Sequence, residues 1–229
     1  MSAKSKKPNV TSVPVVPQRT ERAFSEAQVK ENIRDPQHWI KYDALREIIM
    51  SNGSLRGMIY GYVAEVAFVK EFLEPLGIKD HFKPDDHKKT KSDRNFVHQG
   101  RSYTVQLKSV QTNTIKEVSN GKFVAKIQND ASDRRKVKLK DGSTIETTCY
   151  LAGEYDILGV SLQPFTGKWR FAFKKNKNLK RSTYRGYKPE VQKLLLATLE
   201  DITYPLTPDW TEDLLSLLKD PDLGKRVKS

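Results

Sequence analysis

The hydrophobic pattern of this chain changes its period near residue 80, and this change constrains the fold more than any other feature of the sequence. In residues 54–74 apolar side chains recur at helical spacing after Ser54, a typical N-cap residue. Pro75 and Gly77 then end the helical pattern. The stretches "DRNFV" and "SYTVQLKSV" that follow alternate with a period of two, as strands do. A long helix followed by consecutive strands predicts one α/β or α+β domain.

The long helix carries an acidic residue close to its predicted buried face. At about 100° per residue, the predicted stripe consists of Leu55, Ile59, Tyr62, Val66, Val69 and Leu73. Glu65 falls inside the edge of this apolar arc, whereas Lys70 and Glu71 are placed for solvent. A carboxylate in such a position either has an ion-pair partner or belongs to a site, and both interpretations stay open at this point.

Further strands and turns follow the first hairpin, whose two strands flank "HQGR" around Gly100. The stretch "GKFVAKIQ" is one strand, and "KVKLKDGSTIETT" is a hairpin that turns at Asp141-Gly142. The continuous apolar run "YDILGVSL" predicts a buried central strand with "KWRFAF" as its neighbour. In "SYTVQLKSV", Tyr103 and its alternate neighbours share one face, while Gln106 and Lys108 share the other.

Helices are also predicted near both ends of the chain. Ser25 to Gln28 has capping-box spacing, and a second N-terminal helix is expected over residues 39–50. Near the C-terminus, "PEVQKLLLATL" and "PDWTEDLLSLL" have helical spacing, the latter with Thr207 as its cap. We therefore expect a basic disordered arm over 1–22 and a helical segment over 23–53. The core follows over 54–175, and a basic loop with helices packed on the core occupies 176–229.

Composition narrows the class of partner. Lys and Arg number 41 against 28 Asp and Glu, which gives a net charge of +13, and such an excess favours polyanions, above all nucleic acid. No apolar run approaches the roughly 20 residues that a membrane helix needs, so no membrane partner is expected. No signal-peptide pattern follows the start, so secretion is not expected. The single cysteine, Cys149, cannot form an internal disulfide, which fits a cytoplasmic protein.

Four polar side chains are expected to converge. Asp93 begins the strand paired with the one that carries Gln106 and Lys108, and Glu65 lies on the preceding helix. Mg²⁺ prefers hard oxygen ligands and takes one or two protein carboxylates together with water and substrate phosphate. Two carboxylates and an amide oxygen are therefore a sufficient ligand set, with Mn²⁺ as a substitute ion. An ammonium beside the metal would orient a water molecule and stabilise charge growing on a phosphate.

In this order and on these elements, the residues resemble the PD-(D/E)XK nucleases, the superfamily of type II restriction endonucleases and Holliday-junction resolvases. The resemblance spans roughly residues 54–175 and includes "GEYDILGV" and the "W-x-F" of "KWRFAF". It implies a restriction endonuclease-like core, a central mixed β-sheet flanked by helices. It also implies a metal held by Asp93, Glu65, Gln106 and the backbone carbonyl of Leu107, with Lys108 at the attacking water.

The resemblance has one departure and one ambiguity. Gln106 stands where the family usually has Asp or Glu, a variant found both in active branches and in inactive copies, so Glu65 would have to supply the missing carboxylate. Pro84-Asp85 also spells the start of the motif, but Asp85 lies in a loop ahead of the strand, and Asp93 is preferred. The histidines have no zinc-site spacing and are interpreted as surface residues.

Two basic stretches, residues 133–140 and 174–188, are candidates for holding DNA. The first is a two-stranded ribbon of the kind that enters a major groove, where Arg134 and Arg135 would read guanine edges. The full set of expected DNA contacts is Arg134, Arg135, Lys136, Lys174, Lys175, Lys177, Lys180, Arg181 and Arg185. A solvated charged face is the alternative for either stretch.

Together these features predict a Mg²⁺-dependent endodeoxyribonuclease acting on double-stranded DNA, with a type II restriction endonuclease as the favoured role. Such enzymes usually act as homodimers that cut two strands, and no small-molecule cofactor is expected. A resolvase, homing or phage nuclease of the same fold is the nearest alternative. A non-catalytic nucleic-acid-binding module, in which Gln106 marks a decayed site, is the alternative from another class.

Overall fold

A computed structural model describes residues 42–84, 92–139 and 141–226 of this chain. Contacts divide the chain into two units, Met1–Asn52 and Gly53–Ser229. In the first unit, the described part forms α2 (Tyr42–Ser51), which has no buried side chain. The helix expected over 39–50 is thus confirmed from Tyr42 onward. The expected arm over 1–22 and the short helix expected from Ser25 to Asp35 lie outside the described residues.

The second unit begins with the long helix, but its buried face differs from the predicted stripe. Helix α3 (Gly53–Phe68) continues as a π-helical turn, η2 (Val69–Leu73). Its buried side chains are Ala64, Ala67, Phe68 and Leu73. Of the predicted stripe, Leu73 is buried, but Tyr62 and Val66 are exposed. Apolar side chains lie on nearly every side of this segment, so periodicity alone does not identify the face that packs.

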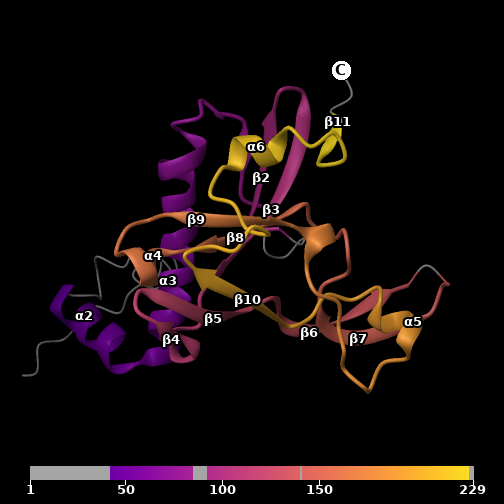
Figure 1. The fold of residues 1–229 in the computed structure, drawn as a ribbon, viewed down its shortest axis with the longest axis horizontal. Coiled ribbons are helices and arrows are strands. Elements are labelled where there is room, and N and C mark those ends of the chain that lie inside the picture. The colour runs from indigo at the N-terminus through magenta and orange to yellow at the C-terminus, as the bar shows by residue number, and fades with distance from the viewer. Residues whose placement is uncertain (1–41, 85–91, 140, 227–229) are drawn as a thin grey trace, which may run out of the picture. The chain divides into compact units, whose positions relative to one another are not determined.

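The central sheet is mixed and has β3 (Arg101–Ser109) in its middle, as Figure 1 shows. The strand order is β1 (His81–Phe82), β2 (Arg94–His98), β3, β8 (Ile157–Ser161) and β9 (Phe171–Lys175), and β11 (Lys225–Arg226) also pairs with β3. Strands β3 and β8 run parallel, whereas the other pairs are antiparallel.

The hairpin of β2 and β3 is formed as predicted. Its turn residues Gln99 and Gly100 both have positive φ, 49° and 70°, which suits the right-handed twist of the strands. The predicted β8 is buried along its whole length, with β9 as its antiparallel neighbour. Between them lie the short helix α4 (Gln163–Thr166) and Gly167 at φ 69°.

Each face of the sheet packs against a different layer. Helices α3 and α6 (Leu214–Leu218) cover one face, where Val105 and Leu107 of β3 are buried. A second sheet covers the other face, and its strands are β4 (Lys116–Ser119), β5 (Lys122–Gln128) and β10 (Leu199–Tyr204). The protein therefore has a mixed α+β fold with helices flanking a central mixed sheet. The strand predicted from "GKFVAKIQ" is confirmed as β5.

A third, two-stranded sheet forms the ribbon predicted around Asp141-Gly142. Its strands are β6 (Asp130–Lys138) and β7 (Thr144–Cys149), and Gly142 has φ 85° in the turn. Figure 1 shows the ribbon beside α5 (Pro189–Gln192), away from the middle of the central sheet. The Tyr187 hydroxyl donates a hydrogen bond of 2.7 Å to Oγ1 of Thr147 and ties the segment before α5 to β7.

The two predicted C-terminal helices are largely wrong. Helix α5 is a single turn, and the chain then enters β10, which pairs with β5 from Leu199↔Gln128 to Tyr204↔Phe123. Helix α6 is capped by Asp213, whose side chain accepts from the backbone N–H of Ser216, and not by Thr207. Pairing with β5 overrides the weak helical preference of a short segment. The described part of 176–226 belongs to the same unit as the core.

A buried ion pair joins β9 to β10. The Lys174 ammonium lies 2.9 Å from Oε1 of Glu200 and 2.6 Å from Oδ2 of Asp209. It also lies 5.3 Å from the ring centroid of Trp210. Two carboxylates around one ammonium offset part of the cost of removing its charge from water. Among the described residues, no helix is long and apolar enough to cross a membrane.

Packing between β3 and β8 can be tested at Gly159. A Cβ atom there would lie 2.8 Å from Cδ2 of Leu107 and 3.3 Å from Cε1 of Phe173. We expect Gly159→Ala to lower the free energy of unfolding by about 1–3 kcal/mol, because the buried core would be overpacked. Urea denaturation followed by circular dichroism measures the change.

The matched control is Gly57→Ala in α3. Among the described residues, an added Cβ at Gly57 meets nothing within 4 Å, so we expect a gain of about 0.5–1 kcal/mol from improved helix propensity. Equal stability changes in the two variants would contradict the tight contact at Gly159.

Candidate active site

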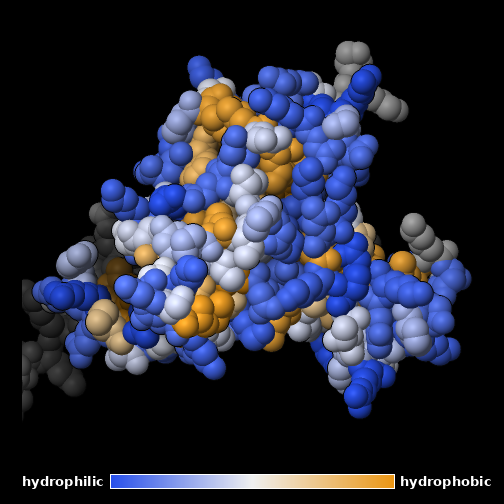
Figure 2. All heavy atoms as spheres, viewed as in Figure 1, coloured by the Kyte–Doolittle hydropathy of each residue, from blue (hydrophilic) through white to orange (hydrophobic). Residues whose placement is uncertain are grey.

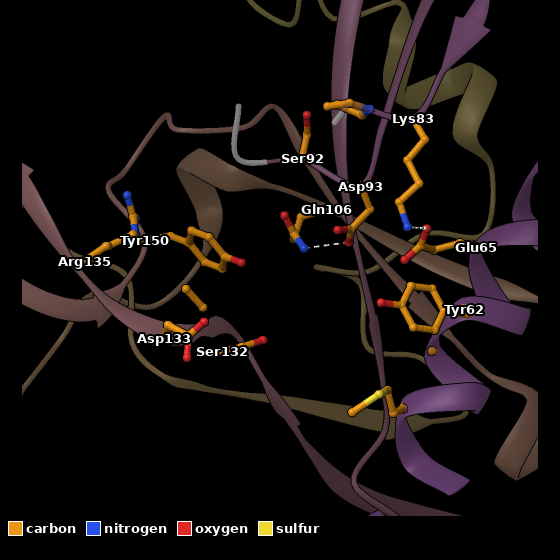
Figure 3. Close-up of a pocket in the computed structure, with 14 residues that line it drawn as sticks. Tyr62, Glu65, Lys83, Ser92, Asp93, Gln106, Ser132, Asp133, Arg135 and Tyr150 are labelled. Atoms are coloured by element: carbon orange, nitrogen blue, oxygen red, sulfur yellow. Dashed lines mark hydrogen bonds and ion pairs between the residues drawn. The ribbon is translucent and has the colours of Figure 1, made fainter. Parts of the chain in front are cut away.

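The structure brings the four sequence-predicted side chains to one cavity. Glu65 of α3, Asp93 just before β2, and Gln106 and Lys108 of β3 all line a cavity of about 1090 Å³. A smaller cavity of about 490 Å³ shares Glu65, Asp93 and Gln106 but does not reach Lys108. Figure 3 shows Glu65, Asp93 and Gln106 directed toward the same space. Residues from distant parts of the sequence therefore meet as the alternation of β3 and the position of Glu65 predict.

Asp93 is fixed where the pairing of β2 with β3 stops. The ladder ends at Arg94↔Val105, and the backbone N–H of Asp93 donates to the carbonyl of Val105 at 2.9 Å. Beyond this point the Asp93 carboxylate, and no longer a backbone carbonyl of β2, accepts the hydrogen bonds from β3. Oδ2 accepts from the backbone N–H of Leu107 at 2.7 Å and from Nε2 of Gln106 at 2.5 Å. The alternative aspartate, Asp85, lies outside the described residues.

The pairing register of β2 and β3 also places the carbonyl of Leu107 at the strand edge where Asp93 lies. In a strand, the N–H and C=O of one residue point to the same edge. The N–H of Leu107 bonds the Asp93 carboxylate, so its carbonyl faces the edge of β3 that the β2 ladder no longer covers. This arrangement suits the expected role of the Leu107 carbonyl beside the carboxylate.

Burial makes the Asp93 carboxylate an unfavourable anion. The pKa of Asp93 is raised to about 6, chiefly by desolvation and to a smaller extent by the nearby negative charge of Glu65. The hydrogen bond from Leu107, the positive charge of Lys108 and the hydrogen bond from Gln106 act in the opposite direction. The ionised carboxylate is thus undercompensated by the described residues, and a cation at this position would favour its charged form.

Lys108 is held by the ribbon strand β6 and by an aromatic ring. Its ammonium donates a 2.9 Å hydrogen bond to the backbone carbonyl of Asp130 and lies 5.6 Å from the ring centroid of Tyr150. Burial lowers the pKa of Lys108, while the negative charges of Asp93 and Asp130 oppose that shift. Lys108 therefore has a fixed direction in the cavity.

Glu65 has an ion-pair partner that the sequence did not indicate. Oε2 of Glu65 lies 2.8 Å from Nζ of Lys83, and the side chain of Glu65 is only 14% exposed. The same ammonium lies 4.7 Å from the ring centroid of Tyr62. Glu65 therefore has an ion-pair partner and also faces the cavity (Figure 3), so both roles considered from the sequence apply to it.

The donor set fits a hydrated Mg²⁺ only if Gln106 changes its orientation. Among the described residues, no group of three or more His, Cys, Asp and Glu side chains is arranged to hold a metal. Two carboxylates with an amide and a backbone carbonyl remain within the needs of Mg²⁺, which keeps several waters. The buried Asp93 carboxylate is the observation that favours a cation. Nε2 of Gln106 faces Asp93, so the amide must turn over for its oxygen to bind the same ion.

The wall opposite α3 consists of residues that the sequence did not place at the metal site, although Arg135 was expected to contact DNA. Ser132, Asp133 and Arg135 of β6 and Tyr150 after β7 line it, as Figure 3 shows. Asp130 lines the larger cavity, and its Oδ1 is buried without a hydrogen-bond partner among the described residues. Strand β6 reaches this wall through tertiary packing of the separate β6–β7 sheet, and no local motif marks these positions.

Alternation along β6 separates the basic residues of the ribbon. Arg134, Lys136 and Lys138 are exposed, whereas Arg135 is partly buried. One Nη of Arg135 donates to Oε2 of Glu154 at 2.5 Å and to the carbonyl of Cys149 at 3.1 Å. The prediction that Arg135 reads bases is therefore not supported, because its guanidinium supports the ribbon. Figure 2 shows the lobe of β6, β7 and α5 as mostly hydrophilic.

Most of the second basic stretch is engaged within the protein. The prediction that Lys174 contacts DNA is wrong, since its ammonium is buried between two carboxylates. Other expected contacts also have intramolecular partners: Lys175 and Lys177 pair with Asp220, Lys180 pairs with Asp201, and Arg181 donates to the carbonyls of Leu179 and Lys177. Arg185 is exposed. The basic residues of this stretch thus mainly form ion pairs and hydrogen bonds that hold surface segments together.

Comparisons with known proteins do not assign a family. No protein-family model matches the chain, and no curated protein matches it. Among solved structures, the chain is similar to a bacterial homing endonuclease, I-Ssp6803I, with 18% sequence identity and a TM-score of 0.35. The similarity covers 60% of this chain and 87% of that chain. A likeness this distant does not assign an activity, so the case for a function rests on the residues of the cavity.

The electrostatic state of Asp93 predicts how stability depends on pH. Its pKa is raised to about 6, so ionisation costs stability as pH rises from about 4 to 6, and the full cost applies above pH 6. We expect Asp93→Asn in EDTA to raise the free energy of unfolding by about 1–3 kcal/mol at pH 8. At pH 4 we expect little difference from the wild type. Urea denaturation at both pH values gives the comparison.

Addition of MgCl₂ at pH 8 is the control for this prediction. Ligand that binds only the folded state stabilises it, so we expect the melting temperature of the wild type to rise and that of Asp93→Asn to stay constant. A variant that is less stable than the wild type at pH 8 in EDTA would show that Asp93 is not an undercompensated anion.

Proposed function

We propose that this protein is a Mg²⁺-dependent endodeoxyribonuclease of the PD-(D/E)XK type. The observation that carries the proposal is the meeting of Glu65, Asp93, Gln106 and Lys108 around one cavity. Two carboxylates, an amide and an ammonium from three elements are the groups that metal-assisted phosphodiester hydrolysis needs. The resemblance in the order of these residues along the chain supports the same conclusion.

The chain's own residues have distinct tasks in this reaction. Asp93 and Glu65, with the Leu107 carbonyl and a turned Gln106 amide, would hold the ion. A bound Mg²⁺ supplies a water of lowered pKa and neutralises charge on the phosphate. Lys108, fixed by the Asp130 carbonyl, orients the attacking water and stabilises the charge that grows on the phosphate oxygens. The water oxygen bonds to phosphorus and one P–O bond breaks, which leaves one phosphate end and one hydroxyl end.

Double-stranded DNA is the proposed substrate because the charge and the ribbon both favour it. The net charge of +13 promotes contact with phosphates. Arg134, Lys136 and Lys138 present three cations on one exposed face of β6, and a two-stranded ribbon fits a major groove. The other face of the same strand lines the cavity through Asp133 and Arg135. DNA held along the ribbon would thus pass beside the candidate active site.

A type II restriction endonuclease is the biological role that we propose. Such an enzyme would act as a homodimer, so that two sites cut two strands. A resolvase, homing or phage nuclease would use the same chemistry, and the response of cleavage to sequence and to branched DNA distinguishes these roles. One observation favours a second class of function: Gln106 already donates to Asp93, and the described residues hold no three-acid metal group. A non-catalytic DNA-binding module would show both features.

Cleavage assays test the proposed activity. We expect the wild type to nick or cut plasmid DNA in Mg²⁺ or Mn²⁺ and not in EDTA. Asp93→Ala and Lys108→Ala should each lower the cleavage rate by at least about 100-fold, because each removes a charge that acts on the reacting phosphate. Gel shift in EDTA should show DNA binding in both variants.

Asp201→Ala is the control for these substitutions. Asp201 pairs with Lys126 and Lys180 at an exposed position of β10, so this variant should cleave as the wild type does. Binding of DNA by the wild type without cleavage in either metal would favour the module and reject the nuclease.

The ribbon has its own test. We expect replacement of Arg134, Lys136 and Lys138 by Ala to reduce the slope of log K against log salt by about 2 to 3, since each lost phosphate contact contributes about 0.9. Arg135→Ala should instead leave the slope nearly unchanged and lower the free energy of unfolding by about 1–3 kcal/mol, because Glu154 loses its cationic partner. Fluorescence anisotropy at several salt concentrations measures the slope. The ribbon is not the DNA contact if the triple variant keeps the wild-type slope.

A further inference from the structure

Tyr150 stands in the wall of the candidate active site opposite α3. It follows β7 directly and lines both cavities together with Glu65, Asp93 and Gln106. Its side chain belongs to the buried core, and the residue is only 5% exposed. Figure 3 shows its hydroxyl directed into the cavity, across from Glu65. A buried ring with its polar end in a cavity suits a group that contacts a ligand.

The ring of Tyr150 is held from several sides. Nζ of Lys108 lies 5.6 Å and Cζ of Arg135 lies 5.4 Å from its centroid. The ring of Tyr155 meets it edge-on, with centroids 5.5 Å apart and an interplanar angle of 88°. Two cations and an aromatic neighbour fix the plane of the ring and therefore the direction of its hydroxyl. Such a group needs little reorganisation when a substrate enters.

The hydroxyl itself is available as a donor. Burial raises the pKa of Tyr150, and the negative charge of Asp93 raises it further, so the hydroxyl keeps its proton at working pH. Among the described residues, the Tyr150 hydroxyl has no hydrogen-bond partner. The neighbouring Tyr155 differs in this respect, because its hydroxyl donates to Oδ1 of Asn129 at 2.8 Å. Of these two adjacent tyrosines, therefore, one hydroxyl is satisfied within the protein and one faces the cavity.

We propose that Tyr150 is a further catalytic residue, whose hydroxyl donates a hydrogen bond to a non-bridging oxygen of the scissile phosphate. This inference rests on the proposed nuclease function. A phosphate that reaches Asp93 and Lys108 lies between α3 and the wall that Tyr150 forms. Lys108 and the Tyr150 hydroxyl then stabilise charge on the phosphate from the same side, since the ammonium lies over the ring.

A purely structural role for Tyr150 makes a different prediction. If the ring only supports Lys108 and Arg135, its removal would matter and its hydroxyl would not. Tyr150→Phe keeps the ring and both cation–π contacts but deletes the donor. Tyr155→Phe makes the same chemical change in the adjacent ring, whose hydroxyl faces Asn129 instead of the cavity.

Single-turnover cleavage of duplex DNA separates these roles. In Mg²⁺, Tyr150→Phe should lower the cleavage rate by about 10- to 1000-fold, the range for loss of one donor to a developing charge. DNA affinity in EDTA and the melting temperature should stay near those of the wild type. Tyr155→Phe should cleave at the wild-type rate, whatever its effect on stability. Equal rates for Tyr150→Phe and the wild type, or a loss of affinity alone, would overturn the inference.

Sulfur substitution at the mapped cleavage site locates the contact. The probe is duplex DNA in which sulfur replaces one non-bridging oxygen, in each of the two stereoisomers. One isomer should slow the wild type by about 10-fold or more, and this effect should shrink in Tyr150→Phe, because the donor that senses the oxygen is gone. An undiminished sulfur effect for both isomers would contradict the contact. Absence of any cleavage by the wild type would reject the proposed function and this inference with it.

Discussion

The bond between the Asp93 carboxylate and the backbone N–H of Leu107 is the interaction on which the site depends. Strand β2 begins at Arg94, directly after Asp93, so its ladder with β3 ends at Arg94↔Val105 and does not reach Leu107. The outer part of β3 would otherwise expose an unpaired donor at this edge. The carboxylate satisfies that donor at 2.7 Å. The early end of β2 therefore creates both the opening of the cavity and the place of Asp93.

This arrangement makes ionisation of Asp93 electrostatically costly. Asp93 is desolvated and close to the charge of Glu65, and neither Lys83 nor Lys108 bonds it directly. Lys83 pairs with Glu65 instead, and Lys108 donates to the Asp130 carbonyl. Among the described residues, Lys83 and Lys108 thus lie near Asp93 without forming an ion pair with it. If the proposed divalent ion binds beside Asp93, its charge would offset this cost, and the free energy of unfolding would then depend on metal concentration.

The parts of the fold that follow from local pattern could be read from the sequence. The alternation of "SYTVQLKSV", the Gly100 and Gly142 turns, and the apolar run of β8 all describe single elements. The face of α3 could not be predicted, because apolar residues surround that helix and a π-helical turn shifts its end. Strand β10 could not be predicted either, since its pairing with β5 joins residues more than seventy positions apart.

Some residues of the candidate site could likewise be predicted from local sequence, and others could not. Asp93, Gln106 and Lys108 belong to one hairpin, so their proximity follows from a turn of two residues. Tyr150, Asp130 and Lys83 reach the cavity only through contacts between separate elements. The basic stretch after residue 173 shows the opposite failure. Its charges have carboxylate partners far along the chain, such as Asp220 for Lys175, and charge counting does not detect them.

The amide at Gln106 has a physical explanation that does not require a decayed site. A carboxylate at this position would face Asp93 across the 2.5 Å that now separates Nε2 from Oδ2, and like charges at such a distance cannot both ionise. Glu65 already contributes a second negative charge to Asp93. The amide removes the third charge and supplies a donor to Asp93. Because an amide can also present its oxygen, Gln106 can stabilise the buried acid as it stands, and under the proposed function its oxygen would turn toward the ion.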